Sequence, residues 1–173
     1  MSKLLAIKIS VYLGAFVLAN FVVLWFGATG LIFTALFLIP FDFVMRCVFH
    51  ETWKGWELIW RMFLLVLSAG ILSYLINIDT KMIAVASVIG YTSAQIVAGA
   101  FYQILMEKSY FTKVNGSDAL GILVDSMCFQ MYAFGTISWG IMGSQFILKL
   151  IGGLFWYYII FKKLKLHEKW LYR

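Results

Sequence analysis

Residues 4–26 read LLAIKISVYLGAFVLANFVVLWF, and this stretch decides the fold class. It is apolar almost throughout and holds a single charged side chain, Lys8. A membrane-spanning helix needs about 20 consecutive, mostly apolar residues, whereas a membrane β-strand is shorter and alternates with a period of two. The run also exceeds the roughly 7–15 apolar residues of a signal peptide. We therefore predict that residues 4–26 form a transmembrane helix.

Stretches of the same character follow along the rest of the 173-residue chain. They cover residues 29–49, 57–76, 82–106, 118–139 and 141–161. These stretches leave no room for a linker or a soluble domain. We predict an all-α integral membrane protein, with one domain over residues 1–173. Six transmembrane helices would form a single compact bundle, followed by a basic tail at residues 162–173.

The composition agrees with this prediction. Hydrophobic residues make up 63% of the chain and charged residues 13%, against roughly 25% charged residues in a soluble domain. A small soluble protein leaves much of its surface in water and could not cover so much apolar area. This excludes a disordered chain, a disulfide-stapled secreted domain and almost any soluble enzyme. The first predicted partner is the lipid bilayer.

The basic residues predict the orientation of the bundle. With six spans, ten Lys and Arg residues fall on the side of the two termini, and only Lys81 falls on the other side. The ten are Lys3, Lys54, Arg61, Lys108, Lys113, Lys162, Lys163, Lys165, Lys169 and Arg173. Because positive charge favours the cytoplasmic side, both termini are predicted to be cytoplasmic. The net charge of +6 then reflects topology and anionic lipid, and we expect no nucleic-acid partner.

Polar residues inside the predicted spans are the best candidates for function, because a charge in hydrocarbon costs at least about 2.5–3.5 kcal/mol. They are Lys8, Asn20, Asp42, Arg46, Gln95, Asp125, Gln130, Gln145 and Lys149. Lys8 is close enough to the helix end to extend to the cytoplasmic surface. The others are expected to face the bundle interior.

Two ion pairs are predicted among these residues. Asp42 and Arg46 are four apart on one helix face and can pair, as a structural or gating contact next to a kink at Pro40. Lys149 lies near the middle of its span and needs a carboxylate, for which Asp125 and Asp42 are the candidates. Such a charge-balanced cluster suits a neutral polar ligand better than an ion channel, which tends to carry rings of one sign.

The fourth span combines small and polar residues. Ala86, Gly90, Ala94 and Ala98 recur every four residues, a spacing that allows helices to approach closely. Packing within one chain is the first interpretation of this row, and a homo-oligomer is the second. Ser87, Tyr91 and Gln95 form a polar strip on the same helix, so Gln95 is expected to point into the bundle.

No catalytic motif is found in the sequence. It contains no phosphate-binding G-x-x-x-x-G-K-[ST] loop, no H-E-x-x-H and no G-x-S-x-G, and an intramembrane aspartyl dyad of Asp42 and Asp125 would lack the usual signals. Cys47 and Cys128 are interpreted as small core residues. His50 and His167 lack further ligands at metal-binding spacing. We expect neither an enzyme nor a metal or other cofactor.

The polar residues, taken in order, resemble the queuosine-precursor transporters, also called the vitamin uptake transporter (VUT) family. The resemblance covers nearly the whole chain. It rests on Ala19-Asn20, the D-x-x-x-R pair Asp42 and Arg46, Ile83-Ala84-Val85-Ala86-Ser87 with Tyr91 and Gln95, Val124-Asp125-Ser126 with Phe129 and Phe134, and Gln145-Phe146 with Lys149.

The resemblance implies a six-helix protein of the bacterial cytoplasmic (inner) membrane that imports 7-deazaguanine bases, chiefly 7-cyano-7-deazaguanine, for queuosine salvage. In a site for such a nucleobase-like ligand, Asp125 would accept hydrogen bonds from the ring N–H and the exocyclic amine, and Lys149 would keep Asp125 ionised. Amides would contact the carbonyl edge, and aromatic rings would stack on the base. The expected substrate-binding residues are Asn20, Tyr91, Gln95, Asp125, Ser126, Phe129, Gln130, Gln145 and Lys149.

Two other functions remain open at this point. Substrate-binding subunits of energy-coupling-factor vitamin transporters are also small six-helix proteins, but they need ATPase partners to move substrate. A non-transporting membrane scaffold is the second alternative, although a scaffold has no reason to bury Asp125 and Lys149 together.

Overall fold

The computed structural model describes residues 3–76 and 81–165, and all elements in these ranges are helical. In chain order they are α1 (Lys3–Phe33), η1 (Thr34–Leu38), α2 (Ile39–Thr52), α3 (Gly55–Ile76), α4 (Lys81–Ile104), α5 (Tyr110–Phe134), α6 (Trp139–Tyr157) and η3 (Tyr158–Lys163). Residues 77–80 of the predicted connection at residues 77–81 lie outside the described residues, as does the tail beyond residue 165, including His167.

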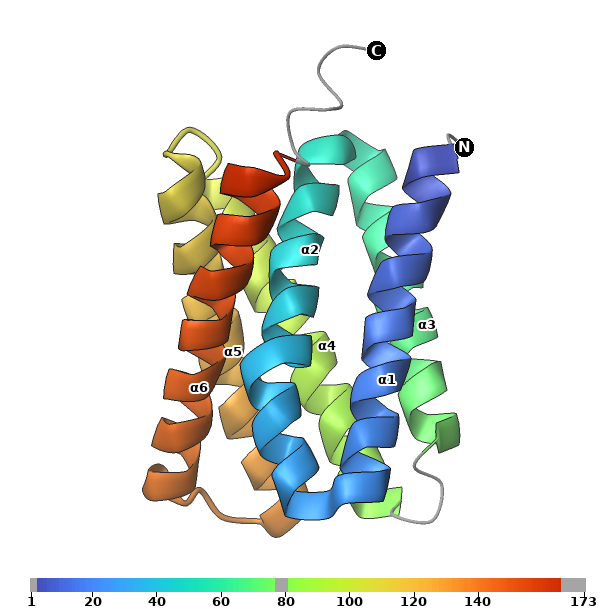
Figure 1. Cartoon of the computed structure of the whole chain (residues 1–173), viewed down its shortest axis with the longest axis vertical. Helices are drawn as coiled ribbons and strands as arrows, with labels where there is room; N and C mark the ends of the chain where they lie inside the picture. Colours follow the sequence, from blue (N-terminus) through green and yellow to red (C-terminus); the bar gives the residue numbers. More distant parts are fainter. Residues whose placement is uncertain (1–2, 77–80, 166–173) are drawn as a thin grey trace.

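The helices form one upright bundle (Figure 1). The start of α1 and the end of η3 lie at the same end of this bundle, called the terminal end below. The sharp turn in α1 and the connection between α5 and α6 lie at the opposite end, called the turn end. The chain therefore crosses the bundle an even number of times.

A glycine separates the first two predicted spans. The continuous element α1 contains one non-helical residue, Gly27, with φ 55° and ψ −128°, a region of backbone space that side chains disfavour. Here the chain reverses direction (Figure 1). Gly30 makes the reversal possible, because a Cβ at this position would lie 2.4 Å from the carbonyl oxygen of Val22. The reversal falls in the gap between the predicted spans at residues 4–26 and 29–49.

The second crossing contains a π-helical turn. Residues of η1 run into α2 with helical backbone angles, and the N–H of Ile39 bonds to the carbonyl of Thr34. Pro40 follows at once and has no N–H to donate, so it leaves the carbonyl of Leu36 without its usual helical partner. Such single π-turns occur frequently at functional sites, and this one lies in the wall of the cavity described below.

The predicted start of the fifth span at Asp118 is wrong. α5 begins at Tyr110, because the hydroxyl of Ser109 accepts a hydrogen bond from the Thr112 N–H over 3.2 Å and caps the helix. It ends at Gly135, whose φ of 69° is typical of a helix C-cap. The first two turns of α5 are polar and had been interpreted as a connection.

The surface of the bundle is apolar and many polar side chains are buried. Among the exposed large side chains are Trp25, Phe26, Trp56, Trp60, Phe63, Ile71, Ile104, Phe111, Trp139, Ile147 and Ile151. The buried polar ones include Lys8, Asp42, Arg46, Gln95, Lys113, Asp118, Gln130 and Lys149. This arrangement is the reverse of that in a soluble protein, and it suits a bundle surrounded by lipid.

Within the described residues, four segments are long and apolar enough to cross a membrane. They are Leu5–Val23, Thr29–Thr52, Gly55–Leu72 and Trp139–Lys163. The helices α4 and α5 are not among these four segments.

Lys8 does not extend to the surface as predicted. It falls on the inward face of α1, in register with the buried residues Leu5, Tyr12 and Phe16, so its side chain is enclosed by the bundle. Helical spacing therefore determines its burial more than its distance from the helix end does.

The small-residue row of α4 packs within the chain. Ala86, Ala94 and Ala98 are fully buried, and α4 and α5 form the most extensive helix pair in the described structure. A Cβ on Gly90 would lie 3.2 Å from the carbonyl oxygen of Asp125. This agrees with the first interpretation of the row, and no second copy of the chain is needed to account for it.

Candidate functional site

A cavity of about 320 Å³ lies between α1, η1, α2, α4, α5 and α6. This volume falls at the lower end of the roughly 300–1,000 Å³ typical of small-molecule sites. Its lining consists of Phe16, Ala19, Asn20, Val23, Leu31, Ile32, Thr34, Ala35, Ile39, Asp42, Tyr91, Asp125, Phe129, Ile141, Ser144, Gln145, Leu148 and Lys149.

The lining changes from exposed to buried with depth. Ile32, just after the turn in α1, is 58% exposed, and Ile141, in the first turn of α6, is also exposed. Asp42 and Lys149, which lie farther from the turn end along α2 and α6, are 2% and 4% exposed. The cavity thus reaches the turn end of the bundle, and its charged groups lie at its buried end.

The central polar contact in the wall is an ion pair between α5 and α6. Lys149 Nζ lies 2.6 Å from Asp125 Oδ2 and donates a second hydrogen bond to the Ser126 hydroxyl over 3.3 Å. The predicted pairing of Lys149 with one of the intramembrane carboxylates is confirmed, and the partner is Asp125. A carboxylate with one oxygen engaged by Lys149 still has lone pairs to offer toward the cavity.

Asp42 belongs to the same cavity but has a different environment. No ion pair or hydrogen bond to its side chain is found among the described residues, and its Oδ1 atom is fully buried without a partner. The sequence had paired it with Arg46. The structure does not show this pair, because the side chain of Arg46 extends toward α5 and contacts Asp118 there.

Amide and aromatic side chains complete the lining. Asn20 donates a hydrogen bond from Nδ2 to the carbonyl of Phe16, one turn earlier on α1, over 2.9 Å. The rings of Phe16 and Tyr91 lie with their centroids 4.8 Å apart, in a tilted arrangement. Gln145 and Phe129 approach from α6 and α5. Flat apolar faces therefore adjoin hydrogen-bonding groups, as recognition of a heteroaromatic ring requires.

The structure brings together six of the nine residues predicted to bind substrate. The six that line the cavity are Asn20, Tyr91, Asp125, Phe129, Gln145 and Lys149. Gln95, Ser126 and Gln130 lie outside the lining. Ser126 accepts a hydrogen bond from Lys149, and Gln130 Oε1 accepts one from the Ser138 N–H over 2.8 Å.

Gln130 and Gln95 thus have different surroundings from those expected. Gln130 ties the end of α5 to the connection before α6, which is a structural role. Gln95 is buried on α4, and no hydrogen bond that meets the geometric criteria reaches its amide group among the described residues. The side chain of Ser87, from the same predicted polar strip, lies outside the described residues.

Sequence reasoning missed Phe16, Thr34 and Ser144 in the cavity. The signal for Phe16 was present, because it precedes Asn20 by four residues and so shares its helix face. Thr34 and Ser144 carried no such signal. Short hydroxyl side chains are common in membrane helices, where they bond to their own backbone, as both do here.

Between the cavity and the terminal end, the bundle is tightly filled. Phe43, Ala94, Ala98 and Ile122 form a fully buried apolar cluster. A Cβ on Gly121 would lie 2.6 Å from the Phe43 ring, so the glycine is needed to admit this ring. The cluster closes the buried end of the cavity.

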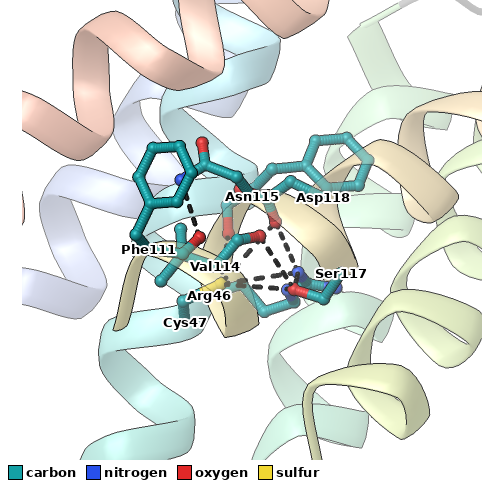
Figure 2. Close-up of polar contacts among 8 residues, drawn as sticks. Arg46, Cys47, Phe111, Val114, Asn115, Ser117 and Asp118 are labelled. Atoms are coloured by element: carbon teal, nitrogen blue, oxygen red, sulfur yellow. Dashed lines mark hydrogen bonds and ion pairs between the residues drawn. The ribbon is translucent and has the colours of Figure 1, made fainter. Parts of the chain in front are cut away.

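The Arg46 cluster forms the next layer (Figure 2). Arg46 is completely buried, and its Nη2 atom donates to Asp118 Oδ1 over 2.6 Å and to the Ser117 hydroxyl over 3.2 Å. Figure 2 shows Arg46 and Cys47 on α2 turned toward Ser117 and Asp118 on α5. Asp118 had been placed at the edge of its span, so this interhelical pair could not be predicted.

After the apolar cluster and the Arg46 cluster, a third layer, which is again polar, lies closest to the terminal end. Glu51 on α2 forms an ion pair with Lys113 on α5 and accepts a hydrogen bond from the Tyr102 hydroxyl over 2.7 Å. One residue earlier, His50 Nδ1 lies 2.9 Å from Gln103 Nε2. The layers together, here called the terminal-end seal, connect α2, α4 and α5 and separate the cavity from the terminal end.

Comparison of the chain with models of known protein families, with curated proteins and with solved structures finds no match. The functional conclusions therefore depend on the cavity, on its ion pair and on the sequence pattern.

Proposed function

We propose that this protein imports a 7-deazaguanine base, such as the queuosine precursor 7-cyano-7-deazaguanine, across the bacterial cytoplasmic membrane for deazaguanine modification of tRNA or DNA. The Asp125–Lys149 pair in the cavity wall, beside amide and aromatic side chains, carries this proposal. The order and spacing of the polar residues, which resemble those of the queuosine-precursor transporters, support it.

The proposed topology has six spans with both termini cytoplasmic. Besides the four apolar segments, α4 and α5 have 24 and 25 residues. At about 1.5 Å per residue they are long enough for a hydrocarbon core of about 30 Å. Their buried polar residues include Gln95, Lys113, Ser117, Asp118, Ser126 and Gln130. The basic residues Lys54, Lys108 and Lys163 belong to the terminal end, as expected for the cytoplasmic side.

The chemistry of the cavity fits the polar edge of a deazaguanine. Asp125 is suited to accept hydrogen bonds from the ring N–H and the exocyclic amine, while the Lys149 ammonium balances its charge. The amide of Gln145 suits the opposite polar edge of the base. The rings of Phe16, Tyr91 and Phe129 supply apolar faces for the ring system. A base lacking the amine would leave buried acceptors unpaired, which is the physical basis for selectivity.

The position of the cavity fits the import direction. In the proposed topology the turn end faces outward, so the cavity receives substrate from outside while the terminal-end seal closes the path to the cytoplasm. Import then requires α2 to separate from α5 and break the Arg46–Asp118 and Glu51–Lys113 pairs. These buried pairs would act as the inner gate of an alternating-access cycle.

The test begins with ligand binding by the purified protein. We expect 7-cyano-7-deazaguanine and guanine-like deazapurines to raise the apparent Tm, because a ligand that binds only the folded state stabilises it by mass action. Adenine should not do so. Asp125→Asn should abolish the shift, whereas Glu57→Gln, in an exposed ion pair on α3, should leave it intact.

Transport by the chain alone then separates the proposed function from its alternatives. Liposomes containing only this protein should take up labelled 7-cyano-7-deazaguanine. Binding without uptake would favour the substrate-binding subunit of an energy-coupling-factor transporter, and absence of both binding and uptake would favour a scaffold. If the Asp125→Asn and Lys149→Met variants, expressed at normal levels, took up the base at the rate of the wild type, the assigned site would be refuted.

A further inference from the structure

Asp42 is a buried carboxylate without a counter-charge. Its side chain is 2% exposed although it lines the cavity, and its Oδ1 atom has no hydrogen-bond partner. The buried Asp118 and the partly buried Glu51 and Asp125 each have a lysine or arginine partner. Within the described part of the chain, Asp42 is therefore the exception.

The groups around Asp42 do not supply the missing positive charge. From α5 and α6, Asp125 and Lys149 neutralise each other across 2.6 Å. From α4, Tyr91 contributes an uncharged phenol, and the cavity-lining residues of α1 and η1 include no ionisable side chain. On α2 itself, Arg46 is one turn away but pairs with Asp118. The cavity thus carries one negative charge in excess if Asp42 is ionised.

An isolated ionised carboxylate is strongly disfavoured away from water, and such a group takes up a proton instead. Buried acids in membrane spans commonly form proton relays for the same reason. We infer that Asp42 is a proton-binding site of the cavity, and that a proton accompanies each neutral base during import. The second half of this inference rests on the proposed function; the first half does not.

The position of Asp42 suggests how the proton is used. When the cavity faces outward, Asp42 receives a proton from that side and is neutral. When α2 separates from α5, Arg46 loses Asp118 and becomes available to the carboxylate one turn away on its own helix. Pairing with Arg46 favours the ionised form of Asp42 and releases the proton to the cytoplasm. One proton and one neutral base cross together, and no other co-reactant is required.

Infrared spectroscopy tests the proton site without any substrate. The wild-type protein at neutral pH should show the carbonyl-stretch band of a protonated carboxyl group, shifted in D₂O. Asp42→Asn should lose this band, and Glu57→Gln, which removes an exposed carboxylate on α3 away from the cavity, should retain it as the control. Asp42→Glu, which preserves an acid, should retain the band at a displaced frequency and serves if Asp42→Asn does not fold. Identical spectra for the wild type and a folded Asp42 variant would overturn the inference.

A liposome experiment tests the coupling. With a pH gradient that is acidic outside, the wild type should accumulate 7-cyano-7-deazaguanine severalfold above the level reached without a gradient, and a trapped pH dye should report acidification of the lumen. Uptake by Asp42→Asn should not respond to the gradient. Wild-type uptake that ignores the gradient would overturn the coupling.

A cationic base provides the decisive comparison. The proton coupling would be overturned if the protein took up the cationic 7-aminomethyl-7-deazaguanine without proton movement and did not take up the neutral 7-cyano-7-deazaguanine. In that case the charge of the substrate itself would neutralise Asp42. If no base binds at all, the proposed function fails, and the infrared result still decides whether Asp42 holds a proton.

Discussion

Lys149 of α6 and Asp125 of α5 face each other across 2.6 Å in the wall of the cavity. Both side chains are largely removed from solvent, and Ser126 accepts a second hydrogen bond from the ammonium. In a bundle with so few interior charges, this pair holds two helices together and presents a carboxylate to the cavity.

Removing one member of the pair should destabilise the protein more than removing both. Breaking a buried ion pair from one side typically costs about 3–5 kcal/mol, because it leaves an uncompensated charge. We expect Asp125→Asn and Lys149→Met each to lower the apparent Tm in detergent, and the double variant to recover part of the loss. The double variant should still fail to bind the base.

The half-exposed pair of Glu57 and Arg61 on α3 is the matched control. Exposed pairs contribute roughly 0–1 kcal/mol, so neither of its single variants should shift the apparent Tm appreciably. Strictly additive losses at Asp125 and Lys149 would contradict the coupling between them.

Two adjacent glycines on α6 should respond in opposite ways to alanine. A Cβ on Gly152 would lie 1.9 Å from the carbonyl oxygen of Leu36 and 2.7 Å from Pro40 Cγ. Gly152→Ala must therefore push α6 away from the π-turn and lower the apparent Tm strongly. Gly153 has nothing within 4 Å of its Cβ position, so Gly153→Ala should be neutral or stabilise by about 0.5–1 kcal/mol. Equal effects in thermal unfolding would show that α6 does not cross η1 at this point.

Gly90 should matter to ligand binding more than to folding. Its Cβ position is 3.2 Å from both the Oδ1 atom and the carbonyl oxygen of Asp125, so Gly90→Ala must displace the carboxylate by a few tenths of an ångström. We expect the base-induced Tm shift to fall while the protein remains folded. Gly14→Ala is the control, since Gly14 has open space at its Cβ position, and an undiminished shift in Gly90→Ala would argue against Asp125 as the contact.

Chemical labelling should report the orientation of the bundle. After Cys47 and Cys128 are replaced by alanine, a single cysteine is introduced at Thr136, in the exposed connection before α6, or at Lys108, in the exposed connection before α5. A membrane-impermeant maleimide added to intact cells should label Thr136→Cys. Lys108→Cys should react only after permeabilisation, and the reverse pattern would invert the topology.

Several features were accessible from the sequence, because local chemistry is enough to specify them. Continuous apolar runs predict helices for lipid, and the gap between the runs at residues 4–26 and 29–49 contains Gly27, where the chain reverses. The partner of Lys149 could be narrowed to two carboxylates by charge balance alone. Asp118 was not among the candidate carboxylates. The first turns of α5 are polar, and the sequence therefore did not indicate that this helix already begins at Tyr110.

The helical class, the apolar exterior and many of the inward-facing polar residues follow from the sequence alone. All three follow from the cost of placing polar groups in hydrocarbon. Which of these residues contact each other depends on the tertiary structure. An i,i+4 spacing places Asp42 and Arg46 on one helix face. The packing of α2 against α5 instead pairs Arg46 with Asp118, so that Asp42 lines the cavity without a charged partner among the described residues. Pairing between helices depends on how they pack against each other, and that information is distributed over the whole chain.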